Sequence, residues 1–224
     1  MGLEKPPRAG YLVGATLLAI ALALLLPAIP QPLDDHLFAD RREAHGIGNF
    51  LDVVSNLAFT LVGLAILLLV LRPRTCFQQP AERWPYLVFA IGLLLTGAGS
   101  WYYHLAPDNE TLFWDRLPMA ISFMSLVAAQ VVDRVHVRAG LLALVPMLLV
   151  GVASVVFWIA TERQGHGNAI PYVVLQAWSV VVLLLLAVLR RSRYTHGKAF
   201  FAVFAGYALA KVFDADPASH APPR

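Results

Sequence analysis

The stretch GSWYYHLAPDNETLFWDRLPM, residues 99–119, joins two long apolar runs through the short polar connection APDNET. Ser100 and His104 stand at the end of the first run, and Asp115 and Arg116 stand at the start of the second. Residues four apart share a face of an α-helix, so we expect the Ser100 and His104 side chains about 6 Å apart. A connection this short favours antiparallel neighbours. The stretch therefore predicts two antiparallel helices whose polar ends meet.

The composition is typical of a membrane protein. Of the 224 residues, 58% are hydrophobic and 14% are charged, and the mean hydropathy is +0.65. A helix needs about 20 mainly apolar residues to cross the hydrocarbon core of a bilayer. Seven apolar runs of about this size follow one another: Tyr11 to Ile29, Phe50 to Leu71, Pro85 to Leu105, Leu112 to Val132, Ala139 to Ala160, Ala169 to Leu189 and Ala199 to Phe213. We therefore expect an all-α protein, a polytopic membrane helix bundle with about seven transmembrane helices.

The two ends of the chain need separate interpretations. The first run is too long for the apolar core of a signal peptide and ends in prolines, so we expect a retained span. The seventh run is shorter and contains Lys211. No linker or internal repeat divides the chain, which predicts a single transmembrane helical-bundle domain over residues 1–214. Residues 215–224 are polar and rich in proline, and they predict a disordered C-terminal tail.

Basic residues are concentrated in alternate connections between the runs. On the side of the N-terminus these are Lys5, Arg8, Arg72, Arg74, Arg83, Arg134, Arg138, Arg190, Arg191, Arg193 and Lys198. By the positive-inside rule, these connections face the cytoplasm. We expect an integral multi-pass protein of the plasma or inner membrane with a cytoplasmic N-terminus, so that residues 99–119 connect their runs on the outer side. The net charge of +3 follows this topology and does not indicate a nucleic-acid partner.

Polar residues inside the apolar runs are the strongest functional signal, because an ionisable side chain in a membrane costs about 3 kcal/mol on insertion scales. Besides Ser100, His104 and Asp115, the candidates are Asp52, Ser55 and Asn56 in the first turns of the second run, and Lys211 and Asp214 at the end of the seventh. The spacing within the second run lets its three residues face the same way. The second, third, fourth and seventh runs all place these groups at one membrane depth. This predicts a common site near the outer interface, where a lipid headgroup and water both reach.

Each of these signals also has a structural interpretation. Serine and histidine commonly form hydrogen bonds between membrane helices. Asp52 and Asn56 suit the first turn of a helix, which they can cap. Lys211 pairs readily with an acid such as Asp214. The remaining histidines and an acidic cluster are typical of solvated surface: His36, His45, His136, His166, His196, His220, Asp34, Asp35, Asp40 and Glu43.

The sequence resembles the alkaline ceramidase family, membrane hydrolases related to the adiponectin-receptor-like proteins. Four segments carry the resemblance: DVVSNLAF (52–59), GSWYYH (99–104), WDRLPM (114–119) and YALAKVFD (207–214). A Ser-x3-His step followed by an Asp eleven residues later is the signature of the group, and Ser100, His104 and Asp115 match it. The resemblance spans roughly residues 36–214 and leaves the first run as an addition.

The resemblance implies a bundle of seven membrane helices around a zinc ion held by three histidines, the first at the position of His104. Zinc with three protein ligands keeps a fourth position for water and lowers the pKa of that water toward neutrality. The resulting hydroxide would attack the amide carbonyl of a ceramide-like lipid and release a fatty acid and a sphingoid base. In this scheme Asp115 acts as general base or orients the water, and Ser100 stabilises the oxyanion or holds the histidine.

Two parts of the family's pattern differ in this sequence. The family takes its other two histidines from a His-x3-His pair on a last helix, and this sequence contains no such pair. The implied zinc site is therefore incomplete in this chain. The family's acidic calcium-binding stretch corresponds to DDHLFADRREAHGIGN, residues 34–49, which lacks the tryptophan of that motif and has Asn49 where a glutamate is expected. We therefore assign no calcium.

Three hypotheses follow for the function. The first is a ceramidase-like integral membrane hydrolase that acts on carbon–nitrogen (amide) bonds, with ceramide or a related membrane lipid as substrate. The second is a catalytically silent lipid-binding or receptor-like family member that lacks the last helix with its histidine pair. The third is an ion-coupled transporter in which Asp52, Asp115 and Lys211 form a relay. Bound zinc and amide hydrolysis separate the first two hypotheses, and flux without hydrolysis would identify the third.

Overall fold

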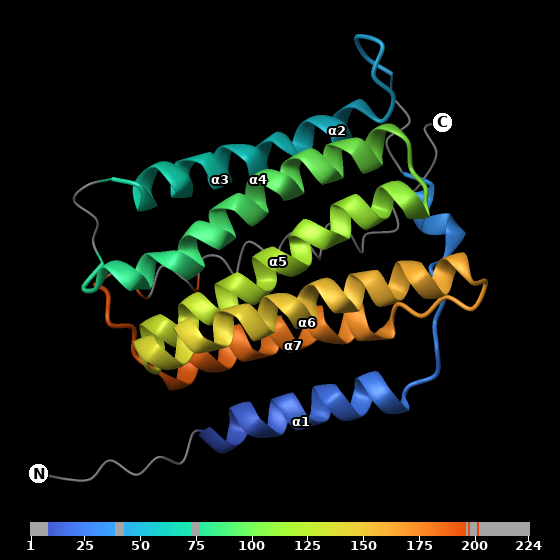
Figure 1. Cartoon of the computed structure of the whole chain (residues 1–224). Helices are drawn as coiled ribbons and strands as arrows, with labels where there is room; N and C mark the ends of the chain where they lie inside the picture. Colours follow the sequence, from blue (N-terminus) through green and yellow to red (C-terminus); the bar gives the residue numbers. More distant parts are fainter. Residues whose placement is uncertain (1–8, 39–42, 73–76, 196, 198–200, 202–224) are drawn as a thin grey trace, which may run out of the picture.

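The computed structural model describes residues 9–38, 43–72, 77–195, 197 and 201 (Figure 1). Its elements are, in chain order, α1 (Ala9–Leu25), the 3₁₀ turn η1 (Leu33–His36), α2 (Phe50–Ser55), α3 (Leu57–Val70), the 3₁₀ turn η2 (Pro80–Glu82), α4 (Arg83–Leu105), α5 (Asn109–Arg134), α6 (Val137–Arg163) and α7 (Ile170–Leu189). Extended pairing within the described residues is limited to an isolated bridge between Ala44 and Ile47. The all-α fold class is therefore confirmed.

Five of the predicted runs are confirmed as helical stretches long and apolar enough to cross a membrane. These are Phe50–Val70, Pro80–Leu105, Asn109–Arg134, Val137–Arg163 and Ile170–Leu189. Of the seventh predicted run, only Phe201 belongs to the described residues. Lys211, Asp214 and the tail 215–224 lie outside them. The number of seven transmembrane helices therefore stays a prediction.

The first helix is shorter than the predicted run Tyr11–Ile29. α1 has 17 residues and ends at Leu25, because Pro27 has no N–H to donate and restricts the residue before it. α1 packs along α7, where the Trp178 indole donates a hydrogen bond to the Thr16 hydroxyl at 3.1 Å. α1 therefore joins the bundle as an apolar helix that is shorter than the other spans.

The connection at residues 99–119 forms the expected antiparallel pair of α4 and α5 (Figure 1). The Asp108 carboxylate accepts a hydrogen bond from the Thr111 backbone N–H at 2.7 Å, and the Thr111 hydroxyl accepts one from the Asp108 N–H at 3.1 Å. This reciprocal capping box satisfies two free N–H groups at the start of α5. The Thr111 N–H also lowers the pKa of Asp108 below its usual value. Local sequence therefore determines where α5 begins.

Glycine brings α4 and α5 into backbone contact. A Cβ at Gly99 would overlap the carbonyl oxygen of Trp114 and would lie 2.8 Å from its carbonyl carbon. Gly92 faces Ser122 in the same interface. Small residues are the usual means by which membrane helices approach so closely.

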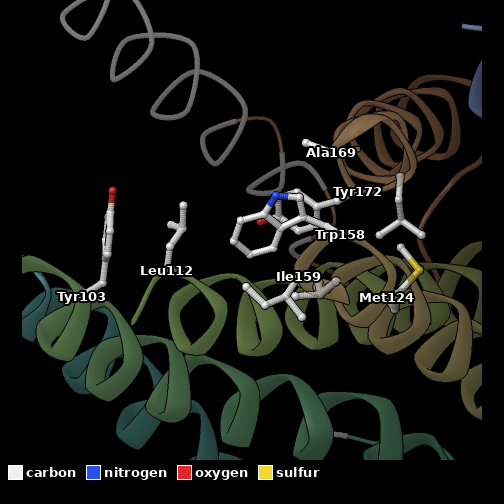
Figure 2. Packing of buried hydrophobic residues seen from close by; sticks show 10 residues of the cluster. Tyr103, Leu112, Met124, Trp158, Ile159, Ala169 and Tyr172 are labelled. Carbon is white, nitrogen blue, oxygen red and sulfur yellow. The ribbon is translucent and has the colours of Figure 1, made fainter. Parts of the chain in front are cut away.

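The main apolar core lies between α5, α6 and α7. Trp158 of α6 is fully buried and belongs to one cluster with Met124 of α5 and Tyr172 of α7 (Figure 2). A second cluster around Leu186 joins α7 to α5. α5 is thus held by α4 on one side and by α6 and α7 on the other.

The chain between α1 and α2 crosses the end of the bundle at which α4 ends and α5 begins (Figure 1). We call residues 29–38 the strap. The Ile29 carbonyl oxygen accepts a hydrogen bond from the Ala169 N–H at 2.8 Å, and the Gln31 N–H donates to Oε1 of Glu162 at 2.6 Å. These bonds fix the strap to the end of α6 and the start of α7.

Candidate active site

Ser100 and Asp115 meet across the contact between α4 and α5. The Ser100 hydroxyl donates a hydrogen bond to Oδ1 of Asp115. Ser100 is buried, with 4% of its surface exposed, and Asp115 is partly buried. The two residues reach each other because Gly99, next to Ser100, lets the helix backbones touch. The predicted meeting of the polar helix ends is therefore confirmed.

His104 lies one turn beyond Ser100, near the end of α4. Its ring packs against Phe38 of the strap, with 4.5 Å between centroids, and against Tyr103, with 5.2 Å. The His104 Nδ1 is buried and has no hydrogen-bond partner among the described residues. His104 is four residues from Ser100 on the same helix, and Ser100 is hydrogen-bonded to Asp115. Ser100, His104 and Asp115 thus form one group, which we call the polar cluster.

The start of the second predicted run lies beside the polar cluster. Asn49 Nδ2 donates a hydrogen bond to the His104 carbonyl oxygen at 2.9 Å. The Asn56 carbonyl oxygen would be 3.3 Å from a Cβ at Gly97. Asp52 stands between these two contacts on α2 and is partly buried. α2 therefore runs along the last turns of α4, at the depth of the cluster.

The expectation that Asp52, Ser55 and Asn56 face the same way is wrong for Ser55. Asn56 is buried, with 5% exposure, whereas Ser55 is exposed. Consecutive helical residues point about 100° apart, so a helix that buries Asn56 turns Ser55 outward. Both side chains donate hydrogen bonds to the Asp52 carbonyl oxygen at 2.8 Å. Such bonds compete with the helical backbone pattern, and the helix is interrupted at Asn56.

Arg116 contacts α6, α7 and the strap. Its guanidinium carbon lies 4.3 Å from the centroid of the Trp158 ring and 5.1 Å from that of Tyr172. Its Nη2 donates a hydrogen bond to Oε1 of Gln31 at 2.5 Å. The Nη1 is buried without a partner among the described residues. Two aromatic faces and one amide therefore stabilise this cation within the bundle.

The strap supplies contacts that the sequence analysis missed. His36 was expected to be solvated, and this expectation is wrong: its Nδ1 is 2.9 Å from the Tyr103 hydroxyl and its Nε2 is 3.0 Å from Oδ1 of Asn109. Phe38 packs on the ring of His104. No helical period exists in this segment to reveal these contacts. The available signal is the presence of two ring side chains in a short polar connection.

The polar cluster supplies part of the ligand set that a zinc site needs. The unpartnered Nδ1 of His104 is the kind of donor that zinc takes from histidine. Within residues 9–38, 43–72 and 77–195, however, no group of three His, Cys, Asp or Glu side chains is arranged to hold a metal ion. The described residues therefore offer one histidine ligand and do not complete a three-ligand zinc site.

Comparison with known proteins gives one informative result. No curated protein and no solved structure matches the chain. The model of the family described as Ceramidase matches residues 44–212, which is more than half of the chain. The matched segment contains Ser100, His104 and Asp115 and all the helices from α2 to α7. The chain belongs to the ceramidase family.

Proposed function

We propose that this protein is an integral membrane hydrolase that cleaves the amide bond of ceramide or a related lipid. The observation that carries the proposal is the hydrogen bond from Ser100 to Asp115 beside the unpartnered Nδ1 of His104. Membership of the ceramidase family supports the substrate class. The five apolar helices support access to a lipid substrate from the bilayer.

Amide hydrolysis needs a base for water, stabilisation of the oxyanion and a proton for the leaving amine. Asp115 would accept a proton from water as the water oxygen bonds to the carbonyl carbon. It would return that proton to the nitrogen as the carbon–nitrogen bond breaks. The products are a fatty acid and a sphingoid base. Ser100 would hold the Asp115 carboxylate in place and, in the transition state, turn its hydroxyl toward the oxyanion.

His104 is the residue that would hold a zinc ion in this scheme. Zinc, when bound, supplies a Lewis acid that polarises the carbonyl and makes bound water acidic. The packing of Phe38 and Tyr103 against the imidazole would fix the direction of its free nitrogen. Preorganisation of this kind is what a metal ligand needs.

We also propose that the protein lies in the plasma or inner membrane with a cytoplasmic N-terminus. Exposed arginines gather at the end of the bundle opposite the polar cluster: Arg83, Arg138 and Arg191. At the cluster end, Arg163 pairs with Glu110, with 2.8 Å between Nε and Oε1. This asymmetry supports a polar cluster on the outer side.

The test is to measure zinc content and ceramide hydrolysis on the same purified protein in mild detergent. We expect His104→Ala to lose both and Asp115→Asn to lower kcat by about 100-fold or more with little change in lipid binding. His166→Ala is the matched control, because His166 is exposed and its ring contacts a backbone carbonyl, that of Thr161, rather than the polar cluster. Full activity of His104→Ala would contradict the metal role. A folded wild type that binds ceramide without hydrolysing it would favour the silent family member.

A further inference from the structure

A pocket lies at the opposite end of the bundle from the polar cluster. It has a volume of about 510 Å³, and its polar lining comes from Gln79, His136, Arg138 and Arg193. Gln79 stands just before η2, and the other three residues come from the start of α6 and from the segment after α7. We propose that this pocket binds the phosphate headgroup of an anionic phospholipid.

The charge balance around the pocket favours an anion. Arg193 is held by Glu82, with 3.2 Å between Nη2 and Oε1, and by Gln78 at 2.7 Å. Glu82 is fully buried, so this pair is a fixed part of the structure. Arg138, in contrast, is exposed and has no hydrogen bond or ion pair to any described residue. Within the described part of the chain, its positive charge is therefore left uncompensated beside a preorganised arginine.

The start of α6 adds to this positive potential. His136 is the N-cap of α6, and the first turn of the helix contains no acidic residue. The N–H groups at a helix N-terminus carry a partial positive charge and bind phosphate groups readily. Arg138 lies in this same first turn. Side-chain and backbone donors therefore converge on one opening.

The rest of the lining fits a lipid better than a soluble phosphate compound. Val135, Val137 and Leu141 form the apolar part of the wall. The span Asn109–Arg134 ends and the span Val137–Arg163 begins on either side of this pocket, which places it at the bilayer interface. Phosphate headgroups lie at this depth, with their acyl chains beside the apolar residues. Basic pockets between membrane helices bind anionic headgroups in this way.

The test uses the full chain, purified in detergent, and measures bound lipid by native mass spectrometry after titration with phosphatidylglycerol or phosphatidylcholine. We expect preferential retention of phosphatidylglycerol. Arg138→Gln should weaken its binding roughly five-fold, and Arg138→Lys should restore most of it. Arg83→Gln is the matched control, because Arg83 is an exposed arginine at the same end that stacks on Trp84 and does not line the pocket.

Three results would overturn the proposal. The first is equal retention of the two lipids by the wild type. The second is an equal loss in Arg138→Gln and Arg83→Gln, which would reflect general surface charge. The third is displacement of phosphatidylglycerol by millimolar glycerol phosphate, which would indicate a site for a soluble phosphate compound. Ceramide hydrolysis does not enter this test, so it stands apart from the proposed function.

Discussion

Gly99→Ala probes the link between helix packing and the polar cluster. The added methyl group would overlap the carbonyl oxygen of Trp114 and come within 2.8 Å of its carbonyl carbon. Both atoms belong to the backbone of α5, so no side-chain rotation can make room. α4 and α5 must move apart by about 1 Å to restore ordinary contact. Ser100 and Asp115 are the next residues on the two helices, and their hydrogen bond would be stretched beyond its normal length.

The magnitude follows from two contributions. Overpacking a tight interface costs about 1–3 kcal/mol. Loss of a hydrogen bond to a charged acceptor costs about 1.5–3 kcal/mol, and the two effects overlap because one displacement causes both. We therefore expect Gly99→Ala to reduce the free energy of unfolding by at least about 2 kcal/mol. A misplacement of this size should also lower ceramide turnover by about 100-fold.

Unfolding in sodium dodecyl sulfate, followed by tryptophan fluorescence, gives the stability, and turnover of a fluorescent ceramide gives the activity. Gly14→Ala is the matched control, because a Cβ at Gly14 meets nothing within 4 Å. Gly92→Ala should fall between the two, since its nearest contact is the rotatable Ser122 hydroxyl at 2.5 Å and its backbone contacts are at 3.3 Å. A Gly99→Ala protein as stable and as active as Gly14→Ala would refute the reasoning.

Two further predictions concern the first turns of α5 and the residue that caps it. Asp108→Ala should lower the free energy of unfolding by about 1 kcal/mol at pH 7, whereas Asp108→Asn keeps a capping group and should lose little. Because the folded state lowers the pKa of Asp108, the stability that this carboxylate contributes is present above the usual pKa of 3.8 and disappears as the pH falls through the lower folded value. Thermal unfolding of the wild type and Asp108→Ala at pH 7 and below pH 4 measures this change. A stability loss in Asp108→Ala that persists in acid would contradict the capping role. Arg116→Ala should destabilise by about 2 kcal/mol, because it leaves Gln31 without its donor and removes packing from Trp158. Arg116→Met keeps most of that packing and should lose less, and equal losses in thermal unfolding would exclude the packing contribution.

The long helices and the Ser100–His104–Asp115 cluster could be predicted from local patterns. A run of about 20 apolar residues has few alternatives to a membrane helix, because every backbone polar group must be satisfied within it. The connection APDNET is too short to let α4 and α5 separate, so residues at its two ends had to meet. The i,i+4 spacing of Ser100 and His104 then required only that α4 be helical.

The strap and the surroundings of Arg116 could not be predicted in this way. Gln31 binds Arg116 and Glu162, which are far away in sequence, through contacts that exist only after the bundle has formed. His36 stands in a polar segment with no period and was therefore interpreted as solvated. The basic residues at the opposite end indicate membrane topology in the sequence, and their pattern does not reveal their partners. The pairing of Arg193 with the buried Glu82 depends on how the loop after α7 packs, which no local pattern predicts.

Asp115 and Arg116 show how α5 separates two opposite charges that are adjacent in sequence. A rotation of about 100° between consecutive helical residues lets one face α4 and the other face α6 and α7. Asp115 meets Ser100 on the first side, and Arg116 lies over Trp158 on the second. Among the described residues the two form no ion pair with each other. An arginine paired directly with Asp115 would occupy the carboxylate oxygens that the proposed chemistry needs for water. The aromatic contact of Arg116 thus leaves Asp115 to the residues that the proposed chemistry requires.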